Sequence, residues 1–443
     1  MTALAPDTDL RTRLRADPYD AYTYGYPHKS AYRTFEQPVD LAELWAGQDR
    51  QHLSGYLHLP FCEMRCGFCN LFTLANPGDG LTAAYLRALA RQAAATAEFL
   101  GDAQIDRLAL GGGTPTFLTV AELEQAFAAL ERAFGTRPDA TPTVIETSPA
   151  TATPDRLRYL REIGVERVSI GIQSTTEREV HRIGRPQAHR TAVGALDAIR
   201  ADGPPLLNVD LMYGLAGQTE ESWRRSLTDI LAWRPEEIFC YPLYVRPLTG
   251  LGRTIDGWAD HRIAQYRIAV EVLTDAGYRQ SSLRRFYLPA VGTTDDEYAA
   301  DPHGKVGLGC GARSYTSSLH YSSEFAVERT PVKRILRDWI ATDDFTVATY
   351  GIELSADERM RRYVLQTLLH VDGLDPDACR AATGLDPVTE LPVLARLVAA
   401  ELAERTGDGR IRLTAEGLEL SDAIGPLLYS PQVRRRSALA EQR

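Results

Sequence analysis

The stretch Tyr56-Leu-His-Leu-Pro-Phe-Cys62-Glu-Met-Arg-Cys66-Gly-Phe-Cys69 passes from an apolar, strand-like segment into three cysteines spaced C-x3-C-x2-C. Three thiolates can hold three irons of a [4Fe–4S] cluster, which normally takes four cysteines. The fourth iron then keeps an open coordination position, which indicates chemistry rather than scaffolding. A zinc knuckle with His58 as the nearest further ligand is the alternative, and three incidental thiols are another.

Around this stretch, apolar strand-like runs alternate with helix-like segments. Continuous Val, Ile and Leu runs are typical of strands covered on both faces, and their alternation with helices predicts a parallel sheet. The expected strands are Gly55–Phe61, Ile105–Leu110, Thr143–Thr147, Arg167–Gln173, Leu206–Tyr213 and Glu237–Val245. The helices expected between them are Leu81–Leu100, Val120–Phe134, Pro154–Ile163, Arg190–Ala201 and Glu220–Ala232.

Six such units predict an α/β fold, a partial (β/α)6 TIM-like barrel. Ligands of such sheets bind at the carboxyl ends of the strands, which is where the first cysteine stands. The rest of the chain predicts an irregular sheet extension and a small helical, winged-helix-like C-terminal domain. The expected boundaries are an N-terminal arm at 1–52, the core barrel at 53–250, the extension at 251–354, the helical cap at 355–430 and a disordered tail at 431–443.

The composition excludes several classes of protein. The chain has 443 residues, 44% of them hydrophobic, and a formal net charge of −10, so it lacks the basic field that nucleic-acid binding uses. No apolar run is long enough for a transmembrane helix, and the first residues do not have a signal-peptide pattern. Six cysteines over this length do not suggest a disulfide framework. We expect a cytoplasmic protein that binds neither nucleic acid nor membranes.

Further candidate residues stand at or near the carboxyl ends of later strands. The run Gly111-Gly-Gly113 exposes main-chain groups to a ligand without side-chain bulk. Glu146 can accept hydrogen bonds from hydroxyl or ammonium groups, and Arg185 is a natural partner for a carboxylate. Asp210 is a charge among apolar strand residues, which is costly unless it is paired. Strand-end capping, internal ion pairs or, for Arg185, a place on the surface are the structural alternatives.

Together these motifs resemble a branch of the radical S-adenosylmethionine (SAM) superfamily. The branch contains oxygen-independent coproporphyrinogen III oxidase, the related heme chaperone and the class C radical SAM methyltransferases, and the resemblance covers roughly residues 24 to 315. It implies that Cys62, Cys66 and Cys69 bind the cluster and that SAM chelates the open iron. The residues it places in SAM binding are Tyr56, Gly112, Gly113, Thr114, Glu146, Gln173, Arg185 and Asp210.

The resemblance implies an enzyme that cleaves SAM reductively and forms a 5′-deoxyadenosyl radical. The expected substrate is a small organic or tetrapyrrole-like molecule, with class C methyl transfer as the specific version, and some members bind a second SAM. Porphyrinogen decarboxylation and a heme-binding chaperone are the alternatives. The oxidase has a further cysteine where this chain has Leu71, which puts its activity in doubt. Arg285 and Arg313 are candidate contacts for substrate carboxylates.

The resemblance leaves the residues that perform the chemistry on the substrate unassigned. A radical SAM enzyme needs an external electron donor, for which a flavodoxin or a ferredoxin is the expected partner. We expect the chain to be a monomer.

Overall fold

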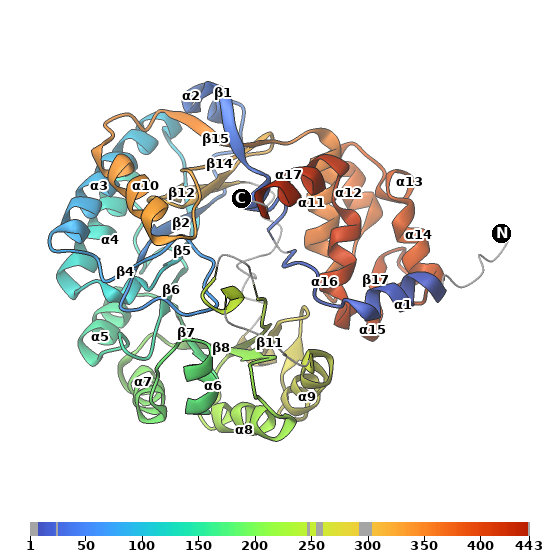
Figure 1. Cartoon of the computed structure of the whole chain (residues 1–443). Helices are drawn as coiled ribbons and strands as arrows, with labels where there is room; N and C mark the ends of the chain where they lie inside the picture. Colours follow the sequence, from blue (N-terminus) through green and yellow to red (C-terminus); the bar gives the residue numbers. More distant parts are fainter. Residues whose placement is uncertain (1–7, 24, 246–248, 254–259, 292–303, 442–443) are drawn as a thin grey trace. The chain divides into compact units, whose positions relative to one another are not determined.

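The computed structural model describes all residues except 1–7, 24, 246–248, 254–259, 292–303 and 442–443 (Figure 1). The chain divides into two compact units. The sheet unit comprises Arg33–Asp260 and Asp301–Gly351, and the helical unit comprises Met1–Tyr32, His261–Ala300 and Ile352–Arg443. Each unit is therefore assembled from segments that are far apart in the sequence.

The centre of the sheet unit is a run of parallel strands in sequence order, as predicted. These strands are β2 (Leu53–Leu59), β5 (Ile105–Gly112), β6 (Thr143–Thr147), β7 (Arg167–Gln173), β8 (Leu206–Tyr213) and β9 (Glu237–Pro242). Strands β2 and β7 are almost entirely buried, which explains their continuous apolar runs. Because all six run in one direction, their carboxyl ends lie at one edge of the sheet.

Helices connect successive parallel strands and lie along their outer side (Figure 1). They are α3 (Leu81–Leu100), α4 (Val120–Phe134), α5 (Pro154–Glu162), α6 (Glu177–Arg182), α7 (His189–Asp202) and α8 (Glu220–Leu231). The start of α4 is fixed by a capping box, in which Thr119 and Glu122 each bond the other's main-chain N–H. Gly135, with φ of +67°, follows the last turn of α4, as is usual at a helix end.

The sheet continues beyond β2 into a mixed part. Strand β12 (Lys305–Leu308) pairs parallel with β2, and β13 (Arg313–Tyr315) and β14 (Leu319–Ser322) add antiparallel strands. Strand β15 (Val347–Glu353) follows β14 and pairs antiparallel with β1 (Arg33–Asp40). Helices α2 (Leu41–Ala46) and α10 (Arg329–Ala341) complete the unit. Strands β12 to β15 lie within the range 251–354 expected for the sheet extension, but residues 261–300 of that range belong to the helical unit.

The described strands of the sheet unit follow one another in an open order from β1 to β9. The large mixed α/β sheet is thus confirmed, whereas a barrel is not, and the partial barrel stays a prediction. Strand β1 also corrects the interpretation of residues 1–52 as an arm, because residues 33–46 belong to the sheet unit as β1 and α2.

The helical unit begins with α1 (Thr8–Ala16) and includes α9 (Arg262–Asp275) with the small ribbon of β10 (Arg279–Gln280) and β11 (Arg285–Tyr287). Its C-terminal part contains α11 (Ala356–Leu368), α12 (Pro376–Thr383), α13 (Pro387–Glu390), α14 (Pro392–Ala399), the hairpin of β16 (Ala403–Arg405) and β17 (Ile411–Leu413), α15 (Ala415–Glu419) and α16 (Ser421–Ile424). Short helices followed by a hairpin agree with the winged-helix-like outline. Helices α13 and α14 follow each other closely, and Pro392 stands at the first position of α14, where its missing N–H is not needed.

The expected disordered tail at 431–443 is wrong for most of its length. Residues Pro431–Glu441 form helix α17, in which Val433 is fully buried. The helix is tied to the unit through Ser430, whose hydroxyl donates to Glu358 at 2.5 Å and accepts from the main chain of Val433 at 3.1 Å. The burial of Val433 and the hydrogen bonds of Ser430 thus hold in place a segment that was expected to be disordered.

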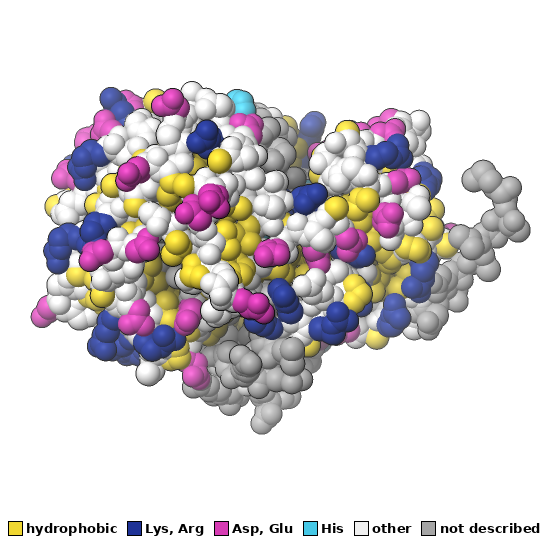
Figure 2. Space-filling view, turned by 90° about the horizontal axis from the view of Figure 1, so that it is seen from above, with side chains coloured by type: hydrophobic (Ala, Val, Ile, Leu, Met, Phe, Trp, Pro, Cys, Tyr) yellow, Lys and Arg dark blue, Asp and Glu magenta, His cyan; other side chains and the backbone are white. Residues whose placement is uncertain are grey.

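Over the described residues no helix combines the length and the apolar character that a membrane span requires. On the face shown in Figure 2, basic and acidic side chains are interspersed rather than gathered by sign.

Candidate active site

The three cysteines lie in the loop that follows β2, at the carboxyl edge of the parallel strands. Cys62 ends the two-residue strand β3 (Phe61–Cys62), which pairs with β4 (Leu74–Ala75) and closes the loop at its base. The main-chain N–H of Thr114, just beyond β5, donates to the carbonyl of Phe61 at 2.8 Å. The loop is thus fixed both to itself and to the neighbouring strand.

Gly67 lies between the second and third cysteines and fixes the middle of the loop. Its N–H donates to the carbonyl of Ile183 at 2.8 Å, and its carbonyl accepts from the N–H of Leu251 at 2.9 Å. A Cβ atom at this position would lie 2.8 Å from the Ile183 carbonyl oxygen. Only glycine allows this close approach of the main chains.

An apolar cluster holds the next loop residue, Phe68. Phe68 packs against buried side chains at the carboxyl ends of β8 and β9 and in the segments that follow α6 and β9. The buried members of this cluster are Ile183, Met212, Leu215, Leu243 and Leu251. These apolar contacts hold Phe68 in place, and they thereby stabilise the loop that carries the three thiols.

Each thiol has a side-chain hydrogen-bond partner. The Thr114 hydroxyl donates to Sγ of Cys62 at 3.6 Å, and Nη1 of Arg185 donates to Sγ of Cys66 at 3.3 Å. Sγ of Cys69 lies 3.9 Å from the hydroxyl of Thr73. Partners of this kind orient ligands and tune the metal they bind.

Burial opposes ionisation of the free thiols. It raises the pKa of the Cys62 thiol to about 12, against the hydrogen bond from Thr114. It also raises the pKa of the Cys66 thiol, against the positive charge of Arg185. Metal binding replaces the thiol proton, so these sulfur atoms suit ligation better than free thiolate chemistry.

Within the described part of the chain, no three His, Cys, Asp or Glu side chains converge as the ligands of a single ion do. The thiolates of an iron–sulfur cube are bound to separate irons and need not meet at one point. As a zinc ligand, His58 would have to give up one of its present contacts, because its Nε2 lies 2.9 Å from the Phe72 carbonyl oxygen and its Nδ1 lies 3.3 Å from the Tyr56 hydroxyl. The donor set fits a cluster.

The glycine run after β5 forms a close junction with two predicted site residues. Gly112 has φ of +108°, and its N–H donates to Oε2 of Glu146 at 3.2 Å. A Cβ atom on Gly111 would lie 2.8 Å from Oε1 of Glu146, and one on Gly113 would lie 2.5 Å from the Phe61 carbonyl oxygen. The structure thus brings Gly112, Gly113 and Glu146 together beside the cysteine loop, as the strand order predicts.

Arg185 and Gln173 lie on the other side of the site, near the end of β7. Gln173 is buried with φ of +68°, a conformation that non-glycine residues rarely adopt. Arg185 donates to the Gly171 carbonyl at 2.6 Å and, through Nε, to Oε1 of Gln187 at 3.0 Å. The surface alternative for Arg185 is therefore wrong, because its guanidinium lies against the main chain of β7 and the Cys66 thiol.

Asp210 lies within β8, where Oδ1 accepts from Nδ2 of Asn208 at 2.9 Å. It faces Gly171 across the β7–β8 pair and Phe239 across the β8–β9 pair. Its charge adds to burial in raising the pKa of the Cys240 thiol. Arg313 belongs to the sheet unit, whereas Arg285 is buried in the helical unit.

Sequence reasoning missed Glu63, the residue directly after the first cysteine. Its Oε1 accepts from the Ser148 hydroxyl at 2.7 Å, while Oε2 is buried without a hydrogen-bond partner among the described residues. A carboxylate next to Cys62 was visible in the sequence, but its burial was not. Thr73 and Gln187 were missed as well, because only the folded chain shows what they contact.

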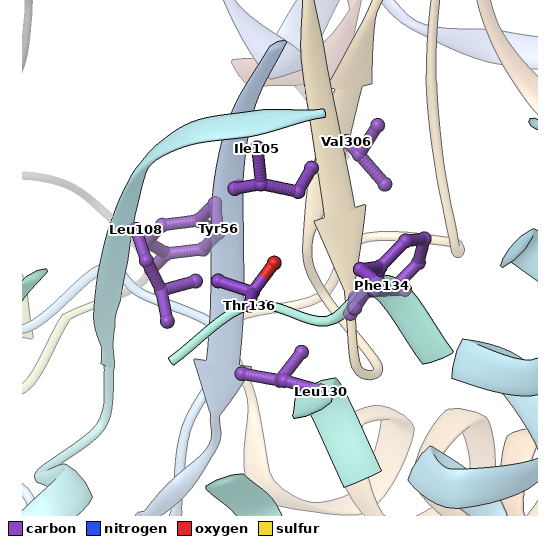
Figure 3. A pocket seen from close by; sticks show the side chains of 9 residues that line it. Tyr56, Ile105, Leu108, Leu130, Phe134, Thr136 and Val306 are labelled. Atoms are coloured by element: carbon purple, nitrogen blue, oxygen red, sulfur yellow. The ribbon is translucent and has the colours of Figure 1, made fainter. Parts of the chain in front are cut away.

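A small pocket between the sheet and α4 is not a candidate site (Figure 3). Its lining surface is apolar and comes mainly from β2, β5, β12 and α4. A ligand site needs a few convergent polar groups, which this lining does not offer. We interpret the pocket as a packing gap between the sheet and α4.

The chain is similar to known proteins over most of its length. Residues 56–230 match the family model of the radical SAM superfamily. The oxygen-independent coproporphyrinogen III oxidase of Pseudomonas aeruginosa is 28% identical, and the match covers 93% of each chain. The heme chaperone HemW of Synechocystis sp. is 31% identical over 60% of this chain and 67% of its own.

The fold of the whole chain also has a solved counterpart. Coproporphyrinogen III oxidase (HemN) from Escherichia coli, whose structure is described as that of a radical SAM enzyme, superposes with a TM-score of 0.80. The match covers 96% of this chain and 99% of that chain, at 22% sequence identity. At this identity the likeness concerns the fold alone.

Proposed function

Because this chain belongs to the radical SAM superfamily, in the branch of oxygen-independent coproporphyrinogen III oxidase and HemW, we propose that it is an enzyme that oxidises a carboxylate-bearing substrate of the porphyrinogen type. The observation that carries this proposal is the extent of the similarity. The match to the oxidase covers 93% of this chain, so it runs through both units, whereas the match to the chaperone covers 60%.

We further propose that Cys62, Cys66 and Cys69 bind a [4Fe–4S] cluster and that SAM binds beside them. When bound, these groups supply one electron and a 5′-deoxyadenosyl radical that abstracts a hydrogen atom. The chain supplies orientation and exclusion of water. The main-chain groups of Gly112 and Gly113 and the Glu146 carboxylate are suited to hold the polar end of SAM, supported by the Gly112–Glu146 hydrogen bond.

Tyr56, Thr114, Gln173, Arg185 and Asp210 remain predicted contacts for SAM. A second SAM beside the first is a further expectation. The reducing electron requires a small one-electron carrier, for which a flavodoxin or a ferredoxin is the proposed partner.

On a porphyrinogen, the expected conversion turns a propionate side chain into a vinyl group. With the cluster and SAM bound, the side chain would lose one hydrogen atom, which would end in 5′-deoxyadenosine, and then carbon dioxide and one further electron. The electron would pass to an acceptor outside the chain. Carboxylate recognition requires cationic groups, for which Arg313 is a candidate in the sheet unit.

One departure from the oxidases favours a second candidate function. The resemblance implies a further cysteine in the oxidases two residues after the third ligand. This chain has Leu71 at that position, and the residue is 44% exposed. An apolar side chain cannot perform the acid–base or redox chemistry of a thiol. A chaperone that binds heme without turnover is therefore the second proposal, in line with the similarity to HemW.

The experiment that separates the proposals is an anaerobic incubation of the reconstituted protein with SAM, dithionite and coproporphyrinogen III. The enzyme proposal predicts 5′-deoxyadenosine and a product that has lost carbon dioxide and two hydrogen atoms for each propionate converted, and neither with Cys66→Ala. Heme binding without 5′-deoxyadenosine would instead support the chaperone.

Methyl transfer was the first specific expectation from the sequence, but the names of the compared oxidases and of HemW do not support it. SAM with a deuterated methyl group tests it directly in the same incubation. Label in the product would show transfer of the methyl carbon, whereas an unlabelled product would agree with decarboxylation.

A further inference from the structure

The three cysteine sulfurs face donors of unequal charge. Thr114 and Thr73 offer neutral hydroxyls at 3.6 Å and 3.9 Å from the first and third thiols. Arg185 offers a charged guanidinium nitrogen to the second, at 3.3 Å. The second sulfur thus has both the shortest of these three contacts and the one that carries a full positive charge.

Two further hydrogen bonds fix the position of the Arg185 guanidinium. Nη2 donates to the carbonyl of Gly171, and Nε donates to Oε1 of Gln187. Gln187 is itself buried, and its Nε2 donates to the Ile172 carbonyl at 3.2 Å. Arg185 is therefore oriented toward the Cys66 sulfur by two consecutive carbonyls near the end of β7. The Gly171 carbonyl acts directly, and the Ile172 carbonyl acts through Gln187.

This geometry bears on the role expected for Arg185. The sequence suggests that Arg185 binds a carboxylate, such as that of SAM. An arginine has five N–H donors, and the three contacts of Arg185 use one on each nitrogen atom, which leaves one N–H on each of Nη1 and Nη2 for a ligand. The contact with the Cys66 sulfur is therefore a role of Arg185 that is separate from, and compatible with, binding of a carboxylate.

We propose that Arg185 is a positioning residue that raises the reduction potential of the cluster through Cys66. The reduced cluster carries one more negative charge than the oxidised cluster, so a fixed cation at a ligand sulfur stabilises the reduced form. Hydrogen bonds to the sulfurs and local charge are known determinants of such potentials. The inference rests on the iron–sulfur site of the proposed function and does not depend on the substrate.

The test is an anaerobic redox titration of the reconstituted protein without SAM, monitored by electron paramagnetic resonance. At a fixed ambient potential, Arg185→Gln is expected to lower the ratio of reduced to oxidised cluster at least tenfold, equal to a shift of about 59 mV for one electron. The matched control is Arg182→Gln, which removes the same charge from an exposed side chain whose Nη1 donates to the Ala216 carbonyl. It is expected to change the ratio less than twofold.

Two further measurements keep the inference falsifiable. Arg185→Lys keeps the positive charge but loses the planar guanidinium, so the reduction potential of its cluster should lie between those of the wild type and Arg185→Gln. If Arg185→Gln does not assemble a cluster, the potential of Arg185→Lys is compared with that of the wild type instead. A potential that is unchanged in the substituted proteins, with weaker SAM binding, would overturn the inference and support the carboxylate role. Failure of the wild type to assemble any cluster would instead overturn the proposed function itself.

Discussion

Gly112 shows how strongly one residue constrains the site. Its φ of +108° is accessible mainly to glycine, and a Cβ atom there would lie 2.5 Å from Nδ1 of His58. We expect Gly112→Ala to lower the free energy of unfolding by about 2–4 kcal/mol, from backbone strain and overpacking. It should also weaken SAM binding, because the N–H that donates to Glu146 would move. Urea denaturation and a SAM titration measure the two effects.

The matched control for Gly112→Ala is Gly194→Ala. Gly194 lies inside α7, where a Cβ atom would have no neighbour within 4 Å. Alanine in a helix interior should stabilise the protein by about 0.5–1 kcal/mol relative to glycine. Equal stability of the two variants would contradict the account of the glycine run.

The residues of the site were predictable from the sequence only where local pattern determines them. The cysteine spacing and the glycine run each lie within one short segment, so their chemistry could be inferred directly. The contact of Arg185 with Cys66 joins residues that are far apart in the chain, and no local pattern predicts it. The buried carboxylate of Glu63 escaped notice for the same reason, because burial depends on the packed neighbours.

At the scale of elements, the cysteine loop depends on its glycine contact. Gly67→Ala would force the loop away from Ile183, and we expect the reconstituted protein to bind at most half the iron of the wild type. Gly78→Ala is the control, since a Cβ atom there has no neighbour within 4 Å and its φ is not positive. Iron and sulfide per chain measure the effect, and equal iron in both variants would refute the role of Gly67.

Elements were predictable to the degree that they are buried. The six parallel strands have apolar runs because helices and sheet cover them, so each appeared in the sequence near its observed bounds. Strand β1 was missed because its sequence is mostly polar, contains Pro38 and is mainly exposed at the edge of the sheet. Helix α17 was missed because one buried residue, Val433, anchors an arginine-rich segment.

At the scale of the whole molecule, the sheet must hold its strand ends in register to place the site. Arg167 and Glu237, at the amino ends of β7 and β9, form an ion pair with side chains that are 5% and 2% exposed. We expect Glu237→Gln to lower the free energy of unfolding by about 3–5 kcal/mol, because it leaves a buried guanidinium without its counter-charge.

The exposed pair of Arg225 and Glu221 on α8 provides the comparison. Glu221→Gln should cost no more than about 0.5 kcal/mol, as for other exposed pairs one helical turn apart. Chemical denaturation monitored by circular dichroism distinguishes the two variants. If Glu237→Gln were as mild as Glu221→Gln, the buried pair would not contribute to holding the sheet.

The proposed function requires that SAM is cleaved at a cluster bound by the cysteine loop. The most direct measurement is the amount of 5′-deoxyadenosine released when the reconstituted protein is incubated anaerobically with SAM and dithionite. We predict release from the wild type and none from Cys66→Ala, which should also lose the absorbance near roughly 400 nm that is typical of thiolate-bound iron clusters. A wild-type protein with a full complement of iron and sulfide that releases no 5′-deoxyadenosine, with or without substrate, would contradict the central claim.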